Sequence, residues 1–88
     1  MPHYIVSYDL RNARDYEPLY AYLRSRIYAV RPLESVWLIE TKLTASELRD
    51  EMKKRMDKDD GVLVVSTKLP AAWSNVDVAS AKLQGHFE

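Results

Sequence analysis

The first part of the chain changes from a strand-like to a helix-like pattern of hydrophobic residues. Residues 4–8 are β-branched or aromatic apart from one serine, which predicts a strand in the centre of its sheet. The next hydrophobic residues recur every three or four positions, which predicts a helix with one apolar face. Asp15 is expected to cap this helix, and Pro18 falls in its first turn, where a missing N–H does no harm. The apolar face consists of Tyr16, Leu19, Tyr20, Leu23 and Ile27.

The middle of the chain repeats this alternation. Extended patterns over residues 28–31 and 35–41 predict two strands, with a break between them at Pro32. Thr44 followed three residues later by Glu47 is a capping box, so a second helix is predicted to begin there. A turn and a fourth strand follow, and this strand is apolar throughout, which predicts that it is central or covered on both faces. The second helix has the buried stripe Leu48, Met52 and Met56, the turn is Asp59, Asp60 and Gly61, and the strand is residues 62–65.

The order strand, helix, strand, strand, helix, strand predicts an α+β fold, a ferredoxin-like βαββαβ sandwich. In this sandwich a four-stranded antiparallel sheet carries both helices on one face. We assign the ferredoxin-like domain to residues 1–66 and a C-terminal extension to residues 67–88. Because two helices cover a single face, the extension is expected to pack on the sheet or on a dimer partner. Within it, a short helix over residues 76–84, capped by Asn75, is predicted.

Length and charge narrow the class of protein. A chain of 88 residues buries a modest core, so pairing with a second copy is expected, as a homodimer. Thirteen basic residues balance thirteen acidic ones, so binding of RNA or DNA must come from a local patch rather than from net charge. The sequence has no cysteine, no signal-peptide pattern and no run of about 20 apolar residues, which favours a cytoplasmic protein with no membrane partner.

Asp9 is the titratable residue that the pattern singles out, because it ends the first predicted strand. A carboxylate there is a suitable ligand for Mg²⁺ or Mn²⁺, which take one or two protein carboxylates together with several waters. One carboxylate rarely makes a site, so a shared metal requires two chains paired with their Asp9 side chains facing each other. Alternatively, Asp9 accepts hydrogen bonds from backbone N–H groups of the following turn.

Other polar and aromatic residues have two interpretations each. The arginines of the first half are suited to phosphate oxygens, or they form salt bridges on a solvated surface. The tyrosines are able to stack on unpaired bases, or they pack in the core or at an interface. His3 and His86 lie near the ends of the chain and are expected to be solvated. The arginines are Arg11, Arg14, Arg24, Arg26 and Arg31, and the tyrosines are Tyr8, Tyr16, Tyr20, Tyr22 and Tyr28.

Segments between residues 4 and 65 resemble the CRISPR-associated small adaptation protein, a metal-dependent nuclease of spacer acquisition. Toxins of the virulence-associated protein D group share the fold of that family. Stand-alone relatives labelled as SinR-family proteins are the most similar, with a strand that also ends in Tyr-Asp-Leu. The matching segments are Tyr-Ile-Val-Ser-Tyr-Asp at 4–9, Ser-Val-Trp at 35–37, Thr44 with Glu47 and Leu48, and Asp-Gly-Val-Leu-Val at 60–64.

The resemblance implies a ferredoxin-like homodimer that cuts RNA or DNA as a divalent-metal-dependent endonuclease in antiviral defence. It implies that Asp9 holds Mg²⁺ or Mn²⁺ at the dimer cleft. Arg14 lies in the loop where basic residues approach the substrate phosphate, and Ser35 takes the place of a serine that follows the first hairpin strand. The family's middle motif has an acidic residue and glycine after phenylalanine, whereas this chain has Trp-Leu-Ile-Glu at 37–40. The alternative function is a non-catalytic homodimeric scaffold or adaptor in a defence or toxin-related system.

Overall fold

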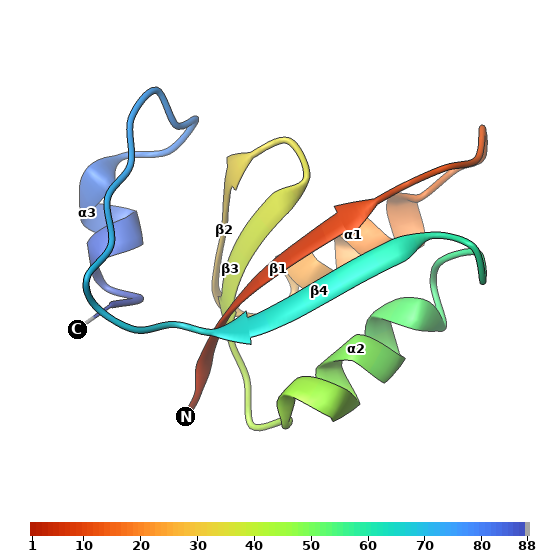
Figure 1. Cartoon of the computed structure of the whole chain (residues 1–88), viewed down its shortest axis with the longest axis horizontal. Helices are drawn as coiled ribbons and strands as arrows, with labels where there is room; N and C mark the ends of the chain where they lie inside the picture. Colours follow the sequence, from red (N-terminus) through yellow and green to blue (C-terminus); the bar gives the residue numbers. More distant parts are fainter. Residues whose placement is uncertain (88) are drawn as a thin grey trace.

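An antiparallel sheet of four strands lies at the centre of the molecule (Figure 1). The computed structural model describes residues 1–87. Its elements are β1 (His3–Asp9), α1 (Glu17–Arg24), β2 (Ile27–Leu33), β3 (Val36–Glu40), α2 (Ala45–Lys53), β4 (Gly61–Ser66) and α3 (Ser80–Gln84). The strands follow the order β2-β3-β1-β4 across the sheet. The architecture is therefore α+β, as the sequence predicts.

β1 is a central strand, as predicted, because it pairs with β3 on one side and with β4 on the other. Its alternate side chains Tyr4, Val6 and Tyr8 are buried on one face of the sheet. Side chains from both α1 and α2 pack against them, so these two helices lie on the same face (Figure 1). Ile5 and Ser7 point to the opposite face, since successive side chains of a strand alternate. The helix residues of the core are Leu19, Leu23, Leu48 and Met52.

β4 is an edge strand, so the prediction that it is central or covered on both faces is wrong. Within the part of the chain that the structure describes, β4 pairs with β1 alone. Val62 and Val64 pack against the core, whereas Leu63 and Val65 are 61% and 46% exposed on the other face. The four apolar residues thus form one partly buried face and one exposed apolar face, which an unbroken apolar run does not distinguish from full burial.

α1 differs from the predicted helix at both ends. Tyr16 occupies the N-cap position, although the Asp15 carboxylate accepts a hydrogen bond from Glu17 N at 2.9 Å. The helix ends at Ser25, whose hydroxyl donates to a carbonyl of the last turn at 2.7 Å. Ile27, predicted for the apolar face of this helix, is instead the first residue of β2 and is 47% exposed. Its branched side chain fits a strand better than a helix, which explains the early end.

Pro32 does not interrupt the second strand, so the predicted break there is wrong. β2 lies at the edge of the sheet, where a residue without an N–H is tolerated. Its register with β3 instead shifts twice, between Ile27 and Val30 and between Val30 and Leu33. Tyr28 lies at the first irregularity with a φ of 53°, in the left-handed region that non-glycine residues rarely adopt. At this irregularity the regular pairing of β2 with β3 is interrupted.

The capping box predicted at the start of α2 is confirmed. Thr44 N donates to Glu47 Oε1 at 2.9 Å, and Glu47 N donates to Thr44 Oγ1 at 3.2 Å. Leu48 and Met52 are fully buried, as predicted. Met56 is also buried, although it lies beyond the end of the helix.

The C-terminal segment, residues 67–87, returns across the sheet face opposite α1 and α2, on the side of β2 (Figure 1). Asp77 N donates to Pro32 O at 2.8 Å, and Leu83 of α3 is buried. The predicted helix over residues 76–84 is reduced to the five residues of α3, and Asn75, with a φ of 55°, does not cap it. Among the described residues, no helix is both long and apolar enough to cross a membrane.

Candidate functional site

Asp9 lies at the exposed end of β1, where the chain enters the loop to α1. Its side chain is 73% exposed, and its carboxylate lies 3.2 Å from the Nε atom of Arg11. An exposed ion pair of this kind contributes about 0–1 kcal/mol, so a ligand with several contacts is able to displace Arg11. The carboxylate of Asp9 is therefore accessible from solvent.

Ser35 lies at the same end of the sheet as Asp9. It belongs to the turn between β2 and β3, and its carbonyl accepts a hydrogen bond from Tyr8 N at 3.2 Å. Tyr8 holds this turn a second time, since its hydroxyl donates to Glu34 O at 3.1 Å while accepting from Trp37 Nε1 at 3.0 Å. Burial raises the pKa of the Tyr8 hydroxyl and outweighs the opposing effect of the Trp37 hydrogen bond, so the hydroxyl stays protonated.

Arg14 does not point to Asp9. Its guanidinium pairs with the carboxylate of Asp57, in the loop between α2 and β4, and lies over the ring of Tyr16 at 5.2 Å. The loop that follows β1 is therefore fastened to the loop that precedes β4. Of the three residues that the sequence predicts for the site, Asp9 and Ser35 share one end of the sheet, and Arg14 is engaged elsewhere.

Asp60 is the buried carboxylate of this region, and the sequence identifies it only as a turn residue. It is 5% exposed, and it accepts three hydrogen bonds, from Arg11 N, from the Tyr16 hydroxyl and from Asp57 N, each at 2.8 Å. Burial by itself would raise the pKa of the carboxyl group. The three hydrogen bonds together outweigh burial, so the pKa of Asp60 lies below its ordinary value.

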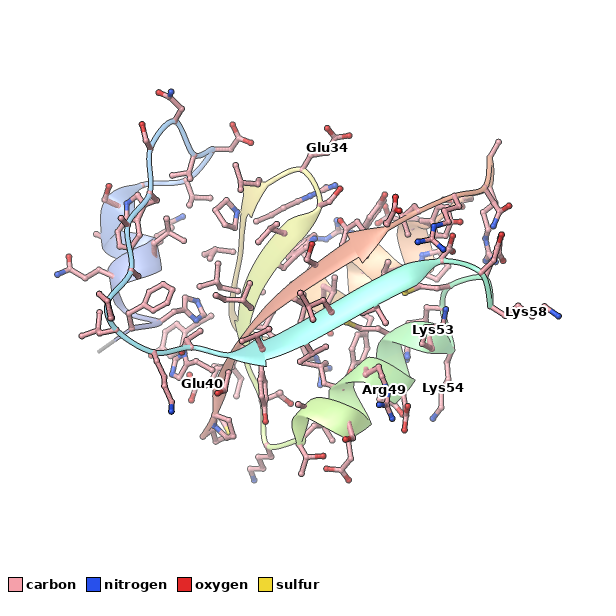
Figure 2. All side chains as sticks on the ribbon, viewed as in Figure 1. Glu34, Glu40, Arg49, Lys53, Lys54 and Lys58 are labelled. Atoms are coloured by element: carbon pink, nitrogen blue, oxygen red, sulfur yellow. The ribbon has the colours of Figure 1, made fainter. Side chains whose placement is uncertain are left out.

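The contacts around Asp60 join the two loops into one structure, which we call the loop clamp (residues 9–16 with residues 57–61). Lys53 Nζ, at the end of α2, donates to the carbonyls of Asp57 and Asp60 at 2.9 and 2.7 Å (Figure 2). From the other loop, Arg11 Nη1 donates to Asp59 O at 2.6 Å. The carboxylate of Asp60 is thus used fully by the protein itself, whereas the carboxylate of Asp9 is exposed at the end of β1.

One chain does not supply a complete metal site. Within the described residues, no group of three histidine, cysteine, aspartate or glutamate side chains is placed to hold a metal ion. Asp9 provides a single carboxylate of the oxygen type that Mg²⁺ and Mn²⁺ prefer. The donor set therefore fits such an ion only if further oxygens come from water, from a substrate or from a second copy of the chain.

The two histidines are not solvated, contrary to the prediction. His86 is 4% exposed, and its Nδ1 atom lies 2.9 Å from Nδ1 of His3. The contact joins residues 83 positions apart, so local sequence gives no signal of it. The histidine contact lies on the sheet face opposite α1 and α2. It is beside Glu40, at the other end of β3 from Glu34 (Figure 2).

The arginines and tyrosines of the first half mostly contact one another or acidic groups. Arg24 pairs with Glu17 on the surface of α1. Arg31 lies 4.8 Å from the ring centre of Tyr20, and Arg26 lies 4.5 Å from that of Tyr22. Guanidinium groups held over aromatic rings in this way contribute to packing as well as to surface charge.

No family model matches the sequence, and no solved structure matches the chain significantly. The fold and the site define an α+β domain with an open antiparallel sheet, an accessible carboxylate at the end of its central strand and a partly buried histidine contact on its second face.

Proposed function

We propose that this protein is a ferredoxin-like homodimer that hydrolyses phosphodiester bonds of RNA or DNA at Asp9, with Mg²⁺ or Mn²⁺ as cofactor. The observation that carries the proposal is the accessible Asp9 carboxylate, which ends the central strand beside the turn that holds Ser35. The strand order β2-β3-β1-β4, with α1 and α2 on one face, supports the ferredoxin-like assignment. The resemblance of residues 4–9 to the adaptation nucleases likewise implies that Asp9 is the metal-binding residue.

A second copy of the chain is part of the proposal, because Asp9 supplies a single carboxylate at the end of β1 and no group of three metal-binding side chains is found among the described residues. The exposed side chains of Leu63 and Val65 on the edge strand β4 support pairing of two chains there. Exposed apolar side chains on an open sheet face favour packing against another chain. A symmetric pair that packs through this face, with the Asp9 ends of the two sheets adjacent, contributes two Asp9 carboxylates to one site.

The residues of this chain have separate roles in the proposed reaction. Bound Mg²⁺ or Mn²⁺ supplies Lewis-acid activation of the phosphodiester. Asp9 holds the cation through its carboxylate oxygens, and its exposed ion pair with Arg11 must first open. Arg11 binds a phosphate oxygen with its planar guanidinium once its hydrogen bond to Asp59 O has also opened, and the Ser35 hydroxyl orients the substrate at the turn. Arg14 approaches a phosphate only when it leaves Asp57.

The ion pairs favour a second candidate function, a non-catalytic homodimeric scaffold or adaptor in a defence or toxin-related system. Arg11, Arg14 and Arg24 are each paired with a carboxylate, and the net charge of the sequence is zero. In a scaffold these pairs stabilise the surface, and Asp9 has no catalytic role.

A nuclease assay separates the two functions. Labelled single-stranded RNA and double-stranded DNA are incubated with the full chain while Mg²⁺ and Mn²⁺ are titrated. Asp50→Asn is a matched control for Asp9→Asn, because Asp50 is 63% exposed and 3.0 Å from Arg49, much like Asp9 and Arg11. We expect cleavage that requires metal, falls to background in Asp9→Asn and persists in Asp50→Asn.

The opposite result is equally clear. If the folded wild-type chain cuts neither substrate at any metal concentration, the enzymatic proposal is wrong. Sedimentation of the same samples then tests the scaffold, which requires a dimer at micromolar concentration, whereas a monomer rejects both functions.

A further inference from the structure

The contact between the two histidines joins the C-terminal segment to the sheet. His3 lies at the start of β1, and His86 follows α3. Their rings are edge to face, with an angle of 83° between them and 2.9 Å between the two Nδ1 atoms. On the far sides of the rings, His86 Nε2 lies 2.7 Å from Tyr28 O, and His3 Nε2 lies 3.7 Å from Glu40 Oε2.

The partners of each ring determine where the hydrogens lie. A backbone carbonyl only accepts, so His86 Nε2 carries a hydrogen and donates to Tyr28 O. The Nδ1 atom of a neutral His86 is then an acceptor, and His3 Nδ1 donates to it. His3 Nε2 then carries no hydrogen and faces the Glu40 carboxylate. With protons on both rings, the two Nδ1–H groups face each other with no acceptor between them.

We propose that His3 and His86 form a pH-sensitive clasp, which holds the C-terminal segment on the sheet at neutral pH and releases it when both rings are protonated. The left-handed backbone of Tyr28 belongs to the clasp, because it is the carbonyl of this residue that fixes the hydrogen on His86. A metal site is the weaker interpretation, since no third histidine, cysteine, aspartate or glutamate among the described residues completes one.

Charged groups on each neighbouring element act on the clasp. Glu40 of β3 favours a proton on His86, while the charge of His3 of β1 opposes it. Lys82 of α3 lines the same cleft, of about 630 Å³, and adds a positive charge beside it. Burial, followed by the charge on His3, lowers the pKa of His86, and these effects outweigh the carbonyl of Tyr28 and the carboxylate of Glu40.

Release of the segment has a structural consequence. Trp73 and Phe87 of the segment are stacked with ring centres 6.0 Å apart and line a cavity of about 310 Å³ above the sheet. Ile5, Val36 and Leu38 form the sheet side of this cavity. When the segment leaves, these apolar side chains become accessible beside the already exposed residues of β4. Acidification therefore uncovers an apolar surface on the second face of the sheet.

The sign of the pH dependence follows from the lowered pKa of His86. A base whose pKa is lower in the folded state stabilises the closed form above the ordinary histidine pKa of about 6.5. That stabilisation is lost as the pH falls through the pKa in the folded protein. The clasp is thus expected to be closed at about pH 7.5 and to open on the acid side of about pH 6.5.

Fluorine NMR of the full chain labelled with 5-fluorotryptophan tests the clasp. The chain has two tryptophans: Trp73 in the segment and Trp37, which is 4% exposed, in the core. The Trp73→Phe variant assigns the two resonances. Between about pH 7.5 and 5 we expect the Trp73 resonance to move to the position of a solvent-exposed indole, while the Trp37 resonance stays in place.

Two variants show whether the histidines cause this change. In His86→Gln the side chain stays neutral, so the Trp73 resonance is expected to be independent of pH. In His3→Gln the amide oxygen accepts from protonated His86, so the segment is expected to stay closed although His86 still titrates. If the His86→Gln variant fails to hold the segment at about pH 7.5, the comparison of wild type with His3→Gln decides the question.

Three results would overturn the clasp. They are a Trp73 resonance that does not move in the wild type, a transition that is unchanged in His3→Gln, and a Trp37 resonance that moves together with that of Trp73. The last result indicates global unfolding by acid rather than local release. None of these outcomes depends on nuclease activity, so the clasp and the proposed function are tested separately.

Discussion

The two faces of the sheet are covered in different ways. On the first face, α1 and α2 close over side chains such as Val6, Leu19 and Met52, which are fully buried. On the second face, the C-terminal segment covers the side of β2 and leaves Leu63 and Val65 exposed on β4. The first cover is made of helices with regular apolar stripes, and the second is made mostly of irregular chain. The difference predicts one cooperative layer and one that is able to open by itself.

The largest loss of stability is expected from a substitution in the core on the first sheet face. Met52→Ala removes a fully buried side chain that packs against both the sheet and the rest of the core. Such a truncation costs about 2–5 kcal/mol, because it loses apolar burial and leaves a cavity. Urea denaturation should show a global loss of this size. Leu69→Ala, at a position that is 68% exposed, is the control and should stay within about 0.5 kcal/mol.

A smaller loss of stability is expected from a substitution in the loop clamp, at the end of the first sheet face. Asp60→Asn removes the charge that accepts hydrogen bonds from Arg11 N, Tyr16 and Asp57 N. Because the pKa of Asp60 is lowered on folding, its stabilisation is present above the ordinary aspartate pKa of about 3.9 and is lost as the pH falls through the folded value.

The measurement is the urea midpoint as a function of pH. Asp60→Asn should be less stable than wild type at neutral pH and should lose less stability on acidification. Asp50→Asn, an exposed carboxylate of α2, should reproduce the wild-type pH profile. Parallel profiles for wild type and Asp60→Asn would show that this carboxylate does not titrate with folding.

The smallest loss of global stability is expected on the second face of the sheet. Leu83→Ala truncates a side chain that is 2% exposed, almost as buried as Met52. Burial alone would predict equal losses for the two variants. If the segment opens independently, the cost of Leu83→Ala is limited to the free energy that docks the segment, and hydrogen exchange should accelerate there while β1 stays protected. Accelerated exchange throughout the sheet would show instead that both faces unfold together.

Local signals explain which parts of the fold are predictable. The capping box at Thr44 and the stripe of α2 depend on residues a few positions apart, and both are present as predicted. The central place of β1 follows from its apolar and aromatic composition. The prediction for β4 is wrong, because the sequence of this strand does not specify how many neighbours it has. The prediction for Ile27 is wrong because helical spacing extends, by coincidence, into the first residue of β2.

The candidate site also has features that the sequence predicts and features that depend on contacts between distant residues. Asp9 is accessible at the end of a strand, a position that the sequence predicts, whereas the partner of Arg14 is an aspartate 43 residues away. Asp60 becomes a buried acceptor only because two distant loops meet around it. Sequence spacing describes neighbours along the chain, and these partners are neighbours only in space.

The sequence by itself determined the order of the elements, the start of α2, the central place of β1 and the position of Asp9 at the end of that strand. These features depend on backbone preferences and on side-chain periodicity, which are local properties. The tertiary structure alone decided that β4 is an edge, that Asp60 is buried and that His3 meets His86. Each of these depends on contacts between segments far apart in the chain, where burial and charge pairing are set by the packing of the whole domain.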